Sequence, residues 1–336
     1  MLEIEISGIK YSQIFNLIEL SGGINGTSKT LKVRALKEEI KFNLGDKIKF
    51  LIDGAEVFQG KIFESSITTE SLIVEFTAFD SSIYLNKNRF VKNFYNKVPS
   101  EIVKEICGEL KLVVGELPKD TVKCTFPAIN KTGYDILLIA YTIQHNKDKK
   151  IYSVACNNNK IEILDEEIYL DITLNSVDDI RRSQYSESIK NMINQVVVYK
   201  TDGNNGQIID KVANEEDKSK YGLFQDVLHY NEDMNNILNA RDMLLGKEQK
   251  AVINVNGNIE LQSGYSVGIY EPNSKLFGKF LIESDKHIWS ADGDYETVIE
   301  LGFERTMDKI TFEKEKAKKV KTRYSLIRGT DREVVE

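Results

Sequence analysis

The sequence contains few of the residues that mark disulfide-bonded, metal-binding or collagen-like proteins. Among its 336 residues are 3 cysteines, 4 prolines, 3 histidines and 1 tryptophan. The cysteines Cys107, Cys124 and Cys156 are odd in number and none is in C-x-x-C spacing, which argues against a zinc ribbon or a redox pair. Free thiols in a reducing compartment are therefore expected. The scarcity of proline also excludes collagen-like and Pro-rich disordered chains.

Long apolar runs and an excess of positive charge are absent as well. No window approaches the ~20 apolar residues of a membrane-spanning helix, and the stretch after Met1 has neither the basic nor the apolar region of a signal peptide. We therefore expect the chain to fold in a cytoplasm, without stable membrane insertion. Its 45 basic and 52 acidic residues give a net charge of -7, which argues against specific binding of nucleic acid through phosphates.

What the sequence does contain is the period-two alternation of half-buried β-strands. Leu31, Val33 and Ala35 alternate with Lys32 and Arg34, so one face of this segment is apolar. Short strands at regular spacing predict a small barrel or a sandwich. Similar patterns, with one two-residue hairpin signal at Asp53-Gly54, cover residues 2–6, 48–52, 57–63 and 72–79.

Residues 90–172 predict a compact α+β domain between two β regions. Ser100 is the predicted N-cap of one helix, and Thr132 with Asp135 predicts a capping box at the start of another. β patterns return from Asn191 onward, interrupted by one helix that Asn231 would cap. The predicted fold is mainly β with an α+β insert: two related tube-type β-barrel domains flanking a small α+β domain. The expected boundaries are 1–89, 90–172 and 173–312, followed by a Lys-rich C-terminal helix or tail at 313–336.

An internal repeat supports the two related β domains. In both copies a glycine starts a strand, and a turn leads to a second strand that contains phenylalanine and ends in Glu-Ser. We interpret the match as a duplication, so residues 45–65 and 264–284 should be equivalent strands. Two similar units per chain halve the number of subunits needed to close a ring. At one offset of 219 residues, Gly45, Ile48, Phe58, Glu64 and Ser65 recur as Gly264, Val267, Phe277, Glu283 and Ser284.

The sequence shows no constellation of catalytic residues. His287 stands two residues after Asp285, a spacing that could orient a base, but no nucleophile motif accompanies the pair. Carboxylate pairs do not stand out in a chain with 29% charged residues, and no sequence spacing specifies the separation that glycoside hydrolysis needs. The pairs considered are Glu64 with Glu75 and Asp292 with Asp294.

Two loops resemble ligand-binding motifs without completing them. Gly23 to Thr30 copies the spacing of the phosphate-binding G-x-x-x-x-G-K-[ST] loop, except that Ser28 replaces the second glycine. A strand pattern follows where that motif needs a helix, so we interpret the segment as a polar loop. The turn at Asp202 lacks the glycine and the glutamate that a calcium loop requires. We therefore predict no catalytic, cofactor-binding or metal-binding residues and no enzymatic activity.

Several weak sequence blocks follow one another in an order that marks a family. The first runs from Glu19 through Gly22 to Val33 and is similar to a W-S-G … R-T-L-x-F block, with Leu20 in place of the tryptophan. Together the blocks cover about residues 1 to 310 and resemble the baseplate hub proteins of contractile phage tails, of the PBSX-like prophage type, and the related R-type bacteriocin hubs. The later blocks are Gly45-Asp46, Val57–Ile62, Phe79-Asp80, Tyr84–Lys87, Ile102–Cys107, Asn194–Val198, Tyr221-Gly222, Gly278–Ile282 through His287, and Ile299–Leu301.

The resemblance implies a structural protein without a cofactor. It implies a homotrimer whose two tube-like domains per subunit form a pseudo-sixfold ring that joins the tail tube to the central spike. The expected partners are the tail tube protein, the central spike protein, the tape-measure protein and other baseplate proteins. The expected location is the baseplate of a virion or tail-like particle assembled in the bacterial cytoplasm.

The repeat strands are predicted to carry the contacts between subunits. Two alternatives remain open at this point, a tail-associated cell-wall hydrolase and a carbohydrate-binding β protein. The candidate contact residues are Ile48, Phe50, Phe58, Ile62, Val267, Ile269, Phe277 and Leu281.

Overall fold

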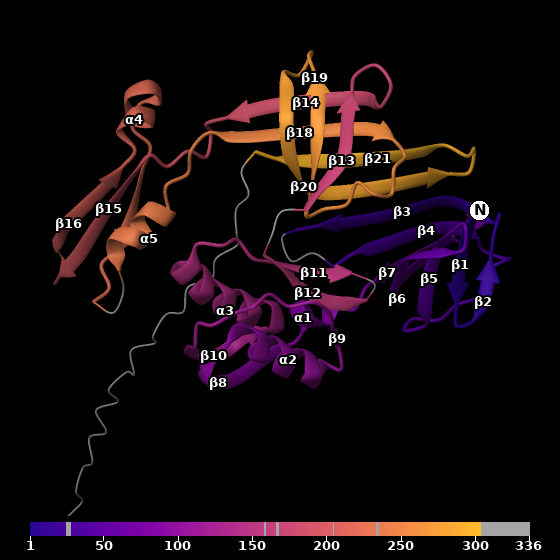
Figure 1. Cartoon of the computed structure of the whole chain (residues 1–336), viewed down its shortest axis with the longest axis horizontal. Helices are drawn as coiled ribbons and strands as arrows, with labels where there is room; N and C mark the ends of the chain where they lie inside the picture. Colours follow the sequence, from indigo (N-terminus) through magenta and orange to yellow (C-terminus); the bar gives the residue numbers. More distant parts are fainter. Residues whose placement is uncertain (25–27, 158, 166–167, 204, 233–234, 304–336) are drawn as a thin grey trace, which may run out of the picture.

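Most of the chain is β-structure, and its largest sheet combines strands from both ends of the sequence (Figure 1). The computed structural model describes residues 1–24, 28–157, 159–165, 168–203, 205–232 and 235–303. Thirteen strands form one sheet in the order β14-β18-β21-β20-β3-β4-β7-β6-β5-β1-β2, and β19 pairs with both β13 and β20. The predicted mainly β class with a few helices is confirmed. The predicted C-terminal helix or tail at 313–336 lies outside the described residues.

The first β unit is a run of seven strands around one apolar core. Leu31, Val33 and Ala35 of β4 are fully buried and the core also contains Phe50 and Phe76, so the predicted alternation is confirmed. The turn at Asp53-Gly54 joins β5 to β6 with φ angles of 52° and 83°, as the hairpin signal predicted. The strands are β1 (Leu2–Ile6), β2 (Ile9–Tyr11), β3 (Phe15–Gly23), β4 (Thr30–Leu36), β5 (Lys47–Ile52), β6 (Ala55–Ile67) and β7 (Ile73–Phe79).

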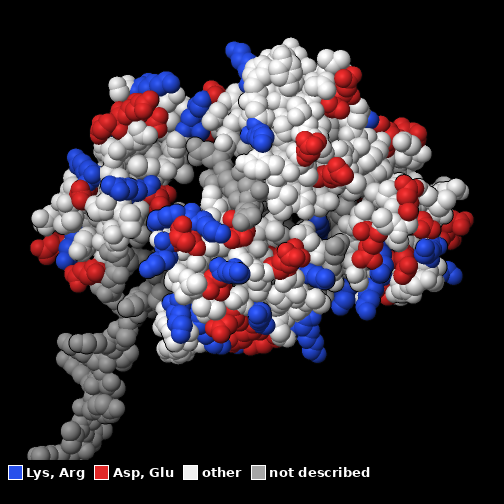
Figure 2. All heavy atoms as spheres, viewed as in Figure 1, with Lys and Arg blue, Asp and Glu red and all other residues white. Residues whose placement is uncertain are grey.

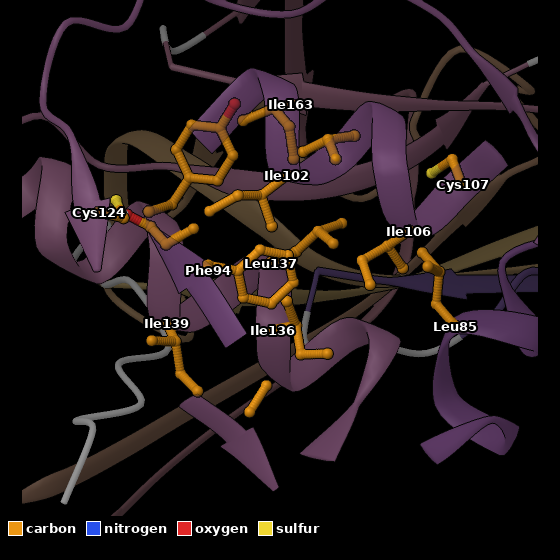
Figure 3. Close-up of a cluster of buried hydrophobic side chains, with 14 of the residues drawn as sticks. Leu85, Phe94, Ile102, Ile106, Cys107, Cys124, Ile136, Leu137, Ile139 and Ile163 are labelled. Atoms are coloured by element: carbon orange, nitrogen blue, oxygen red, sulfur yellow. The ribbon is translucent and has the colours of Figure 1, made fainter. Parts of the chain in front are cut away.

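The insert packs helices against two small sheets. Its core joins apolar side chains from α2 and α3 to Phe94 of β8, and Figure 3 shows Ile102 and Ile106 beside Ile136 and Leu137. Cys107 and Cys124 are buried in this core as free thiols, and burial raises the pKa of each to about 11. The elements are α1 (Ile83–Lys87), β8 (Arg89–Lys97), α2 (Pro99–Leu110), β9 (Val113–Val114), β10 (Cys124–Thr132), α3 (Gly133–Asp148), β11 (Ser153–Asn157) and β12 (Lys160–Leu164).

One of the two predicted caps in the insert is confirmed and the other is wrong. The Asp135 backbone N–H donates to Thr132 Oγ1 and the Thr132 N–H donates to Asp135 Oδ2, both at 3.0 Å, which is the predicted capping box. The N-cap of α2 is Val98 rather than Ser100, which lies inside the first turn. The hydroxyl of Ser100 instead donates to Asp120 at 3.0 Å, so a distant carboxylate binds this helix start.

The second β unit has six strands, and a small subdomain interrupts it between β14 and β18. The subdomain helix α5 is capped by Asn235 rather than by Asn231, whose backbone N–H donates to Asn236. The unit consists of β13 (Ile168–Asn175), β14 (Ile180–Ser188), β18 (Glu248–Asn256), β19 (Tyr265–Glu271), β20 (Leu276–Ser290) and β21 (Tyr295–Gly302). The subdomain consists of β15 (Gln195–Asp202), β16 (Asn205–Ala213), α4 (Glu215–Tyr221), β17 (Gln225–His229) and α5 (Asn236–Asp242).

The two β units have the same strand order, as an internal repeat predicts. The order β3-β4-β7-β6-β5-β1 in the first unit corresponds to β14-β18-β21-β20-β19-β13 in the second, and the strands also follow one another along the chain in the same way. Only the last pair differs, because β1 is antiparallel to β5 whereas β13 is parallel to β19. The correspondence therefore extends over six strands, well beyond the single hairpin in which the repeat was found.

Two irregularities in the ladders occupy equivalent places in the two units. A bulge adds a residue to one strand and bends it, and bulges are retained within protein families. Their coincidence here indicates a common origin for the two units. The register shifts lie between Phe15 and Leu17 in β3, Ile180 and Arg182 in β14, Ile62 and Glu64 in β6, and Ile282 and Ser284 in β20.

The offset proposed for the repeat is correct for its first strand and one residue short for its second. Gly45 and Gly264 have φ angles of 89° and 92°, and their N–H groups donate to the carbonyls of Ile62 and Ile282 at 2.7 and 2.9 Å. The glycines are 219 residues apart but the isoleucines are 220 apart, because the second hairpin holds one more residue. The matches of Phe58, Glu64 and Ser65 with Phe277, Glu283 and Ser284 are therefore wrong by one position.

Candidate assembly interface

The two β units join through β20 and β3, which are far apart in sequence and antiparallel in the sheet (Figure 1). Seven residue pairs connect the strands, with His287 opposite Leu20. His287 and Trp289 face the core and are buried, whereas Lys286 lies half exposed and forms an ion pair with Glu19 at 3.2 Å. The junction therefore has an apolar side and a solvent side.

Trp289 of the second unit completes the core of the first. Its ring lies 5.0 Å from that of Phe50, edge to face, and stacks on Tyr295 at 4.6 Å. Tryptophan buries a large apolar area, and it is 94% removed from solvent at this position. The first unit therefore lacks part of its core unless β20 is paired with β3.

The buried pair Asp285 and His287 is the group at this junction that most resembles catalytic machinery. His287 Nε2 lies 3.4 Å from Asp285 Oδ2, and His287 Nδ1 lies 3.0 Å from the Tyr295 hydroxyl. Burial acts to raise the pKa of Asp285, but the adjacent His287 imidazole and a hydrogen bond from the Ser263 backbone N–H outweigh it and hold this pKa below its ordinary value. His287 is 1% exposed, and its Nδ1 also lies 3.1 Å from the Thr297 hydroxyl, so the buried side chain links β20 to β21.

The segment that resembles a phosphate loop instead ties three parts of the chain together. Lys29 Nζ donates to Gln262 Oε1 at 2.9 Å, and the Lys29 backbone N–H donates to Asp80 Oδ2 at 3.2 Å. Burial raises the pKa of Asp80, although hydrogen bonds from Ser82 partly offset this. The strand β4 follows where a phosphate loop would need a helix. Residues 25–27, which lie within the predicted polar loop, are outside the described residues.

One carboxylate of each candidate pair forms an ion pair with a basic side chain. Glu75 lies 3.0 Å from Lys32, and Asp294 lies 2.8 Å from Arg181. Within the described ranges, no three His, Cys, Asp or Glu side chains are grouped so that they could hold a metal ion. The same part of the chain contains no helix that is both long enough and apolar enough to cross a membrane.

The eight residues predicted to contact neighbouring subunits lie mainly in the core of the chain itself. Their side chains are therefore occupied within one molecule, with the exception of Phe277, which is 54% exposed and packs edge to face on Tyr270 at 5.4 Å. Contacts between subunits through this set stay a prediction. The seven buried members are Ile48, Phe50, Phe58, Ile62, Val267, Ile269 and Leu281.

The sequence did not reveal which edges of the large sheet are open. Among the described residues, β14 pairs only with β18, and β6 beyond Ile62 pairs only with β7. All four residues of Glu64–Ile67 are exposed, including the apolar Ile67 at 60%. An open strand edge presents unpaired backbone groups that can accept a strand of another chain. The only signal in the sequence was an apolar residue at the end of a polar run.

The fold is that of phage tail proteins. The 43 kDa tail protein of prophage MuSo2 from Shewanella oneidensis superposes with a TM-score of 0.72 at 13% identity, covering 90% of this chain and 97% of that protein. The E. coli c3393 protein is a component of the type VI secretion system with structural similarity to the T4 tail proteins gp27 and gp5. It gives a TM-score of 0.57 at 11% identity and covers 92% of this chain and 79% of its own. At such identities the similarity shows the fold alone.

Sequence comparison shows the family. The model of the YQBQ-like family matches residues 18–301, and the chain belongs to this family. The Bacillus subtilis (strain 168) protein YqbQ is 25% identical over 308 residues, covering 84% of this chain and 92% of the relative. The protein XkdQ of the phage-like element PBSX, from the same strain, is 26% identical over 259 residues, covering 72% and 77%. The resemblance to PBSX-type tail proteins is thereby confirmed.

Proposed function

We propose that this protein is a structural baseplate hub subunit of a contractile phage tail or of a tail-like particle such as an R-type bacteriocin. Three copies would form a ring of six β units that joins the tail tube to the central spike. One observation carries the proposal: two β units with the same strand order are joined edge to edge, through β20 and β3, in a single sheet.

The strand order explains how such a ring could close. The junction within the chain uses β20 of one unit and β3 of the other. Among the described residues, the equivalent part of β6 beyond Ile62 and the outer side of β14 are open edges. A second copy can therefore repeat between chains the contact that each chain makes within itself. Head-to-tail contacts of this kind form closed rings when the rotation closes. Three chains with two units each supply six similar positions, the number required opposite a hexameric tube.

An exposed aromatic patch offers a surface for the other baseplate partners. Tyr270 and Phe277 lie at the tip of the β19–β20 hairpin, and Lys279 Nζ lies 4.4 Å above the ring of Tyr169. Figure 2 shows few charged side chains over β13 and β19. Exposed apolar patches mark protein contact sites. The expected partners are the tail tube, central spike, tape-measure and other baseplate proteins, and Phe277 would contact one of them.

The protein would act without catalysis, in the baseplate of a particle assembled in the bacterial cytoplasm. Two observations support this role: the pair Asp285 and His287 is buried inside the sheet, and one carboxylate of each candidate pair is held in an ion pair. Figure 2 shows charges of both signs interspersed on the visible face. Such a surface would let nucleic acid pass without being gripped through its phosphates.

The oligomeric state tests the proposal directly. Mass photometry of the full chain, alone and with its neighbouring central spike protein, is expected to show a trimer, at least when the spike is present, because assembly depends on concentration and partners. A monomer under both conditions, at every concentration tested, would contradict the proposal.

Two alternative functions make different predictions. A tail-associated cell-wall hydrolase would clear purified peptidoglycan, whereas a hub would leave it unchanged. A stand-alone carbohydrate-binding protein would remain monomeric and bind glycan, whereas a hub would assemble with tube or spike proteins.

A further inference from the structure

We infer that the exposed arm of β6, residues Glu64–Ile67, pairs antiparallel with β14 of a second copy of the chain, with Ser66 opposite Ser186 and Ile67 opposite Tyr185. This inference rests on the proposed ring and adds the strands and the register that would close it. It is derived by transferring the junction observed within one chain to the open edges of two chains.

The first step matches β6 to β20. Ile62 and Ile282 are equivalent, since each accepts a hydrogen bond from the glycine that starts the preceding strand and each is followed by a bulge. Counting from these residues, Ser66 corresponds to Lys286 and Ile67 corresponds to His287. In β20 these positions contact β3, whereas in β6 they are exposed.

The second step matches β14 to β3 through the neighbouring strands. In the first unit Ile18 is opposite Val33, and in the second unit Ser183 is opposite Ile253. The shared bulge in the two outer strands confirms this alignment. Tyr185 then corresponds to Leu20, and Ser186 corresponds to Ser21. Within the described residues, β14 has no strand along the edge where β3 meets β20.

The third step transfers the observed register. Lys286 lies opposite Ser21 and His287 lies opposite Leu20 in the junction within the chain. The equivalent positions between two chains place Ser66 opposite Ser186 and Ile67 opposite Tyr185. The neighbouring pairs are then Glu64 with Ser188 and Ser65 with Glu187.

The side chains suit this arrangement. Ile67 and Tyr185 take the places of the buried His287 and Leu20, so an apolar residue that is 60% exposed in one chain would be covered by an aromatic one. Ser66 and Ser186 take positions on the solvent side. No two charges of the same sign face each other across the four pairs, so the register carries no electrostatic penalty.

The backbone geometry identifies a residue pair at which an engineered disulfide could fix the register between the two strands. Ile24 N–H donates to the carbonyl of Glu283 at 2.9 Å, so these opposed residues form a hydrogen-bonded pair. Pairs alternate along an antiparallel ladder, and Ser21 with Lys286, three positions on, is a non-hydrogen-bonded pair. Ser66 and Ser186 inherit this type, for which the Cα atoms are about 4.5 Å apart. That separation lies within the range of a disulfide.

The experiment uses the full chain carrying Ser66→Cys mixed with the full chain carrying Ser186→Cys, oxidised under native conditions with the spike protein present. We expect a covalent dimer band to appear on a non-reducing gel, with one chain of each mixed trimer left as monomer. In the double variant we expect covalent dimers and trimers. The matched control pairs Ser65→Cys with Ser186→Cys, because residues 65 and 66 face opposite sides of the strand. The unsubstituted chain measures the background from its own thiols.

Further pairs separate the register from the ring. Ser66→Cys with Gln184→Cys and Ser66→Cys with Ser188→Cys trap registers shifted by two residues in either direction. A trimer by mass photometry with cross-links in a shifted pair, or in none of the three, would overturn the inference and leave the proposed hub standing. Absence of any oligomer would contradict both. A cross-link in the Ser66 and Ser186 pair alone would establish the register.

Discussion

The first and second β units share their strand order but differ in the segments that connect equivalent strands. In the first unit β3 leads to β4 through the short segment between Gly23 and Thr30, whereas between β14 and β18 the second unit holds three strands and two helices. The bulges nevertheless occupy the same places in both. Backbone pairing has therefore been retained while side chains and loops have changed, as expected where insertions lie at the surface.

The units also differ in whether the outer edge of their first long strand is paired with another strand. The edge of β3 is covered by β20 of the same chain, whereas the equivalent edge of β14 is open in the described residues. The same strand edge therefore forms a junction inside the chain in the first unit. In the second unit, the equivalent edge would form the contact between chains in the proposed ring. Four predictions test this comparison.

The largest expected effect on stability comes from Trp289→Ala at the internal junction. Removing this ring leaves a cavity in the core of the first unit, and we expect unfolding by urea, followed by circular dichroism, to show a loss of about 3–5 kcal/mol. Trp289→Phe should retain most of the stability, since it keeps an aromatic ring near Phe50. A loss below about 1 kcal/mol for Trp289→Ala would mean that the first unit does not depend on the second.

Asp285→Asn should weaken the same junction in a pH-dependent way. The folded-state pKa of Asp285 is lowered, so its charge contributes stability above the unfolded value of about 3.9, and this contribution is lost as the pH falls through the folded-state pKa. We expect the variant to be about 1–3 kcal/mol less stable at neutral pH. The difference should shrink below about pH 4 when unfolding is followed by Trp289 fluorescence.

The control for this variant is the equivalent position in the first unit. Ser65 is exposed, so Ser65→Ala should have no comparable effect at any pH. A stability difference for Asp285→Asn that does not change with pH would contradict the role of its charge.

Gly45→Ala and Gly264→Ala test whether the two hairpins are equivalent. Both glycines have positive φ, and an added Cβ would meet nothing closer than 3.7 Å, so the cost comes from the backbone angle in each case. Equal losses of about 1–2 kcal/mol in thermal unfolding would sharpen the comparison. Gly108→Ala, within α2, should instead be stabilising by about 0.5–1 kcal/mol.

The smallest effect on the folded chain is expected from Ile67→Asp, which acts on the open edge. Because Ile67 is exposed, the free energy of unfolding of the monomer should change by no more than about 0.5 kcal/mol. Trimer formation should be lost, because a carboxylate would replace the apolar contact with Tyr185. Leu72→Asp, at a residue that is 76% exposed and outside the paired arm, is the matched control and should still assemble. Equal assembly by both variants would contradict the proposed edge.

Local features of this fold were predictable because local chemistry determines them. The alternation at residues 31–35 predicted β4, since alternate side chains of a strand face opposite sides. Asp53-Gly54 predicted its hairpin because the turn needs positive φ at both residues. The capping box of Thr132 and Asp135 marks the start of α3, as predicted.

Features that depend on distant segments were not predictable in the same way. The carboxylate of Asp120 binds the start of α2 from twenty residues away, so Ser100 is not its cap. The register of the repeat was wrong by one residue because hairpin length is decided by its turn and not by the strand pattern. No local sequence pattern indicates that β20 pairs with β3. The open edges were therefore not predictable either, because they are the strands equivalent to this pair.

The length of β20 has a mechanical consequence. This strand runs without interruption over 15 residues, from Leu276 to Ser290, or about 50 Å at the usual rise per residue. It is hydrogen-bonded to β19, β21 and β3, so it belongs to both units at once. A push on one unit is therefore carried to the other along this shared strand, which bends at the bulge between Ile282 and Ser284. In the proposed ring, that bulge would be the place where the two units of one chain change their relative tilt.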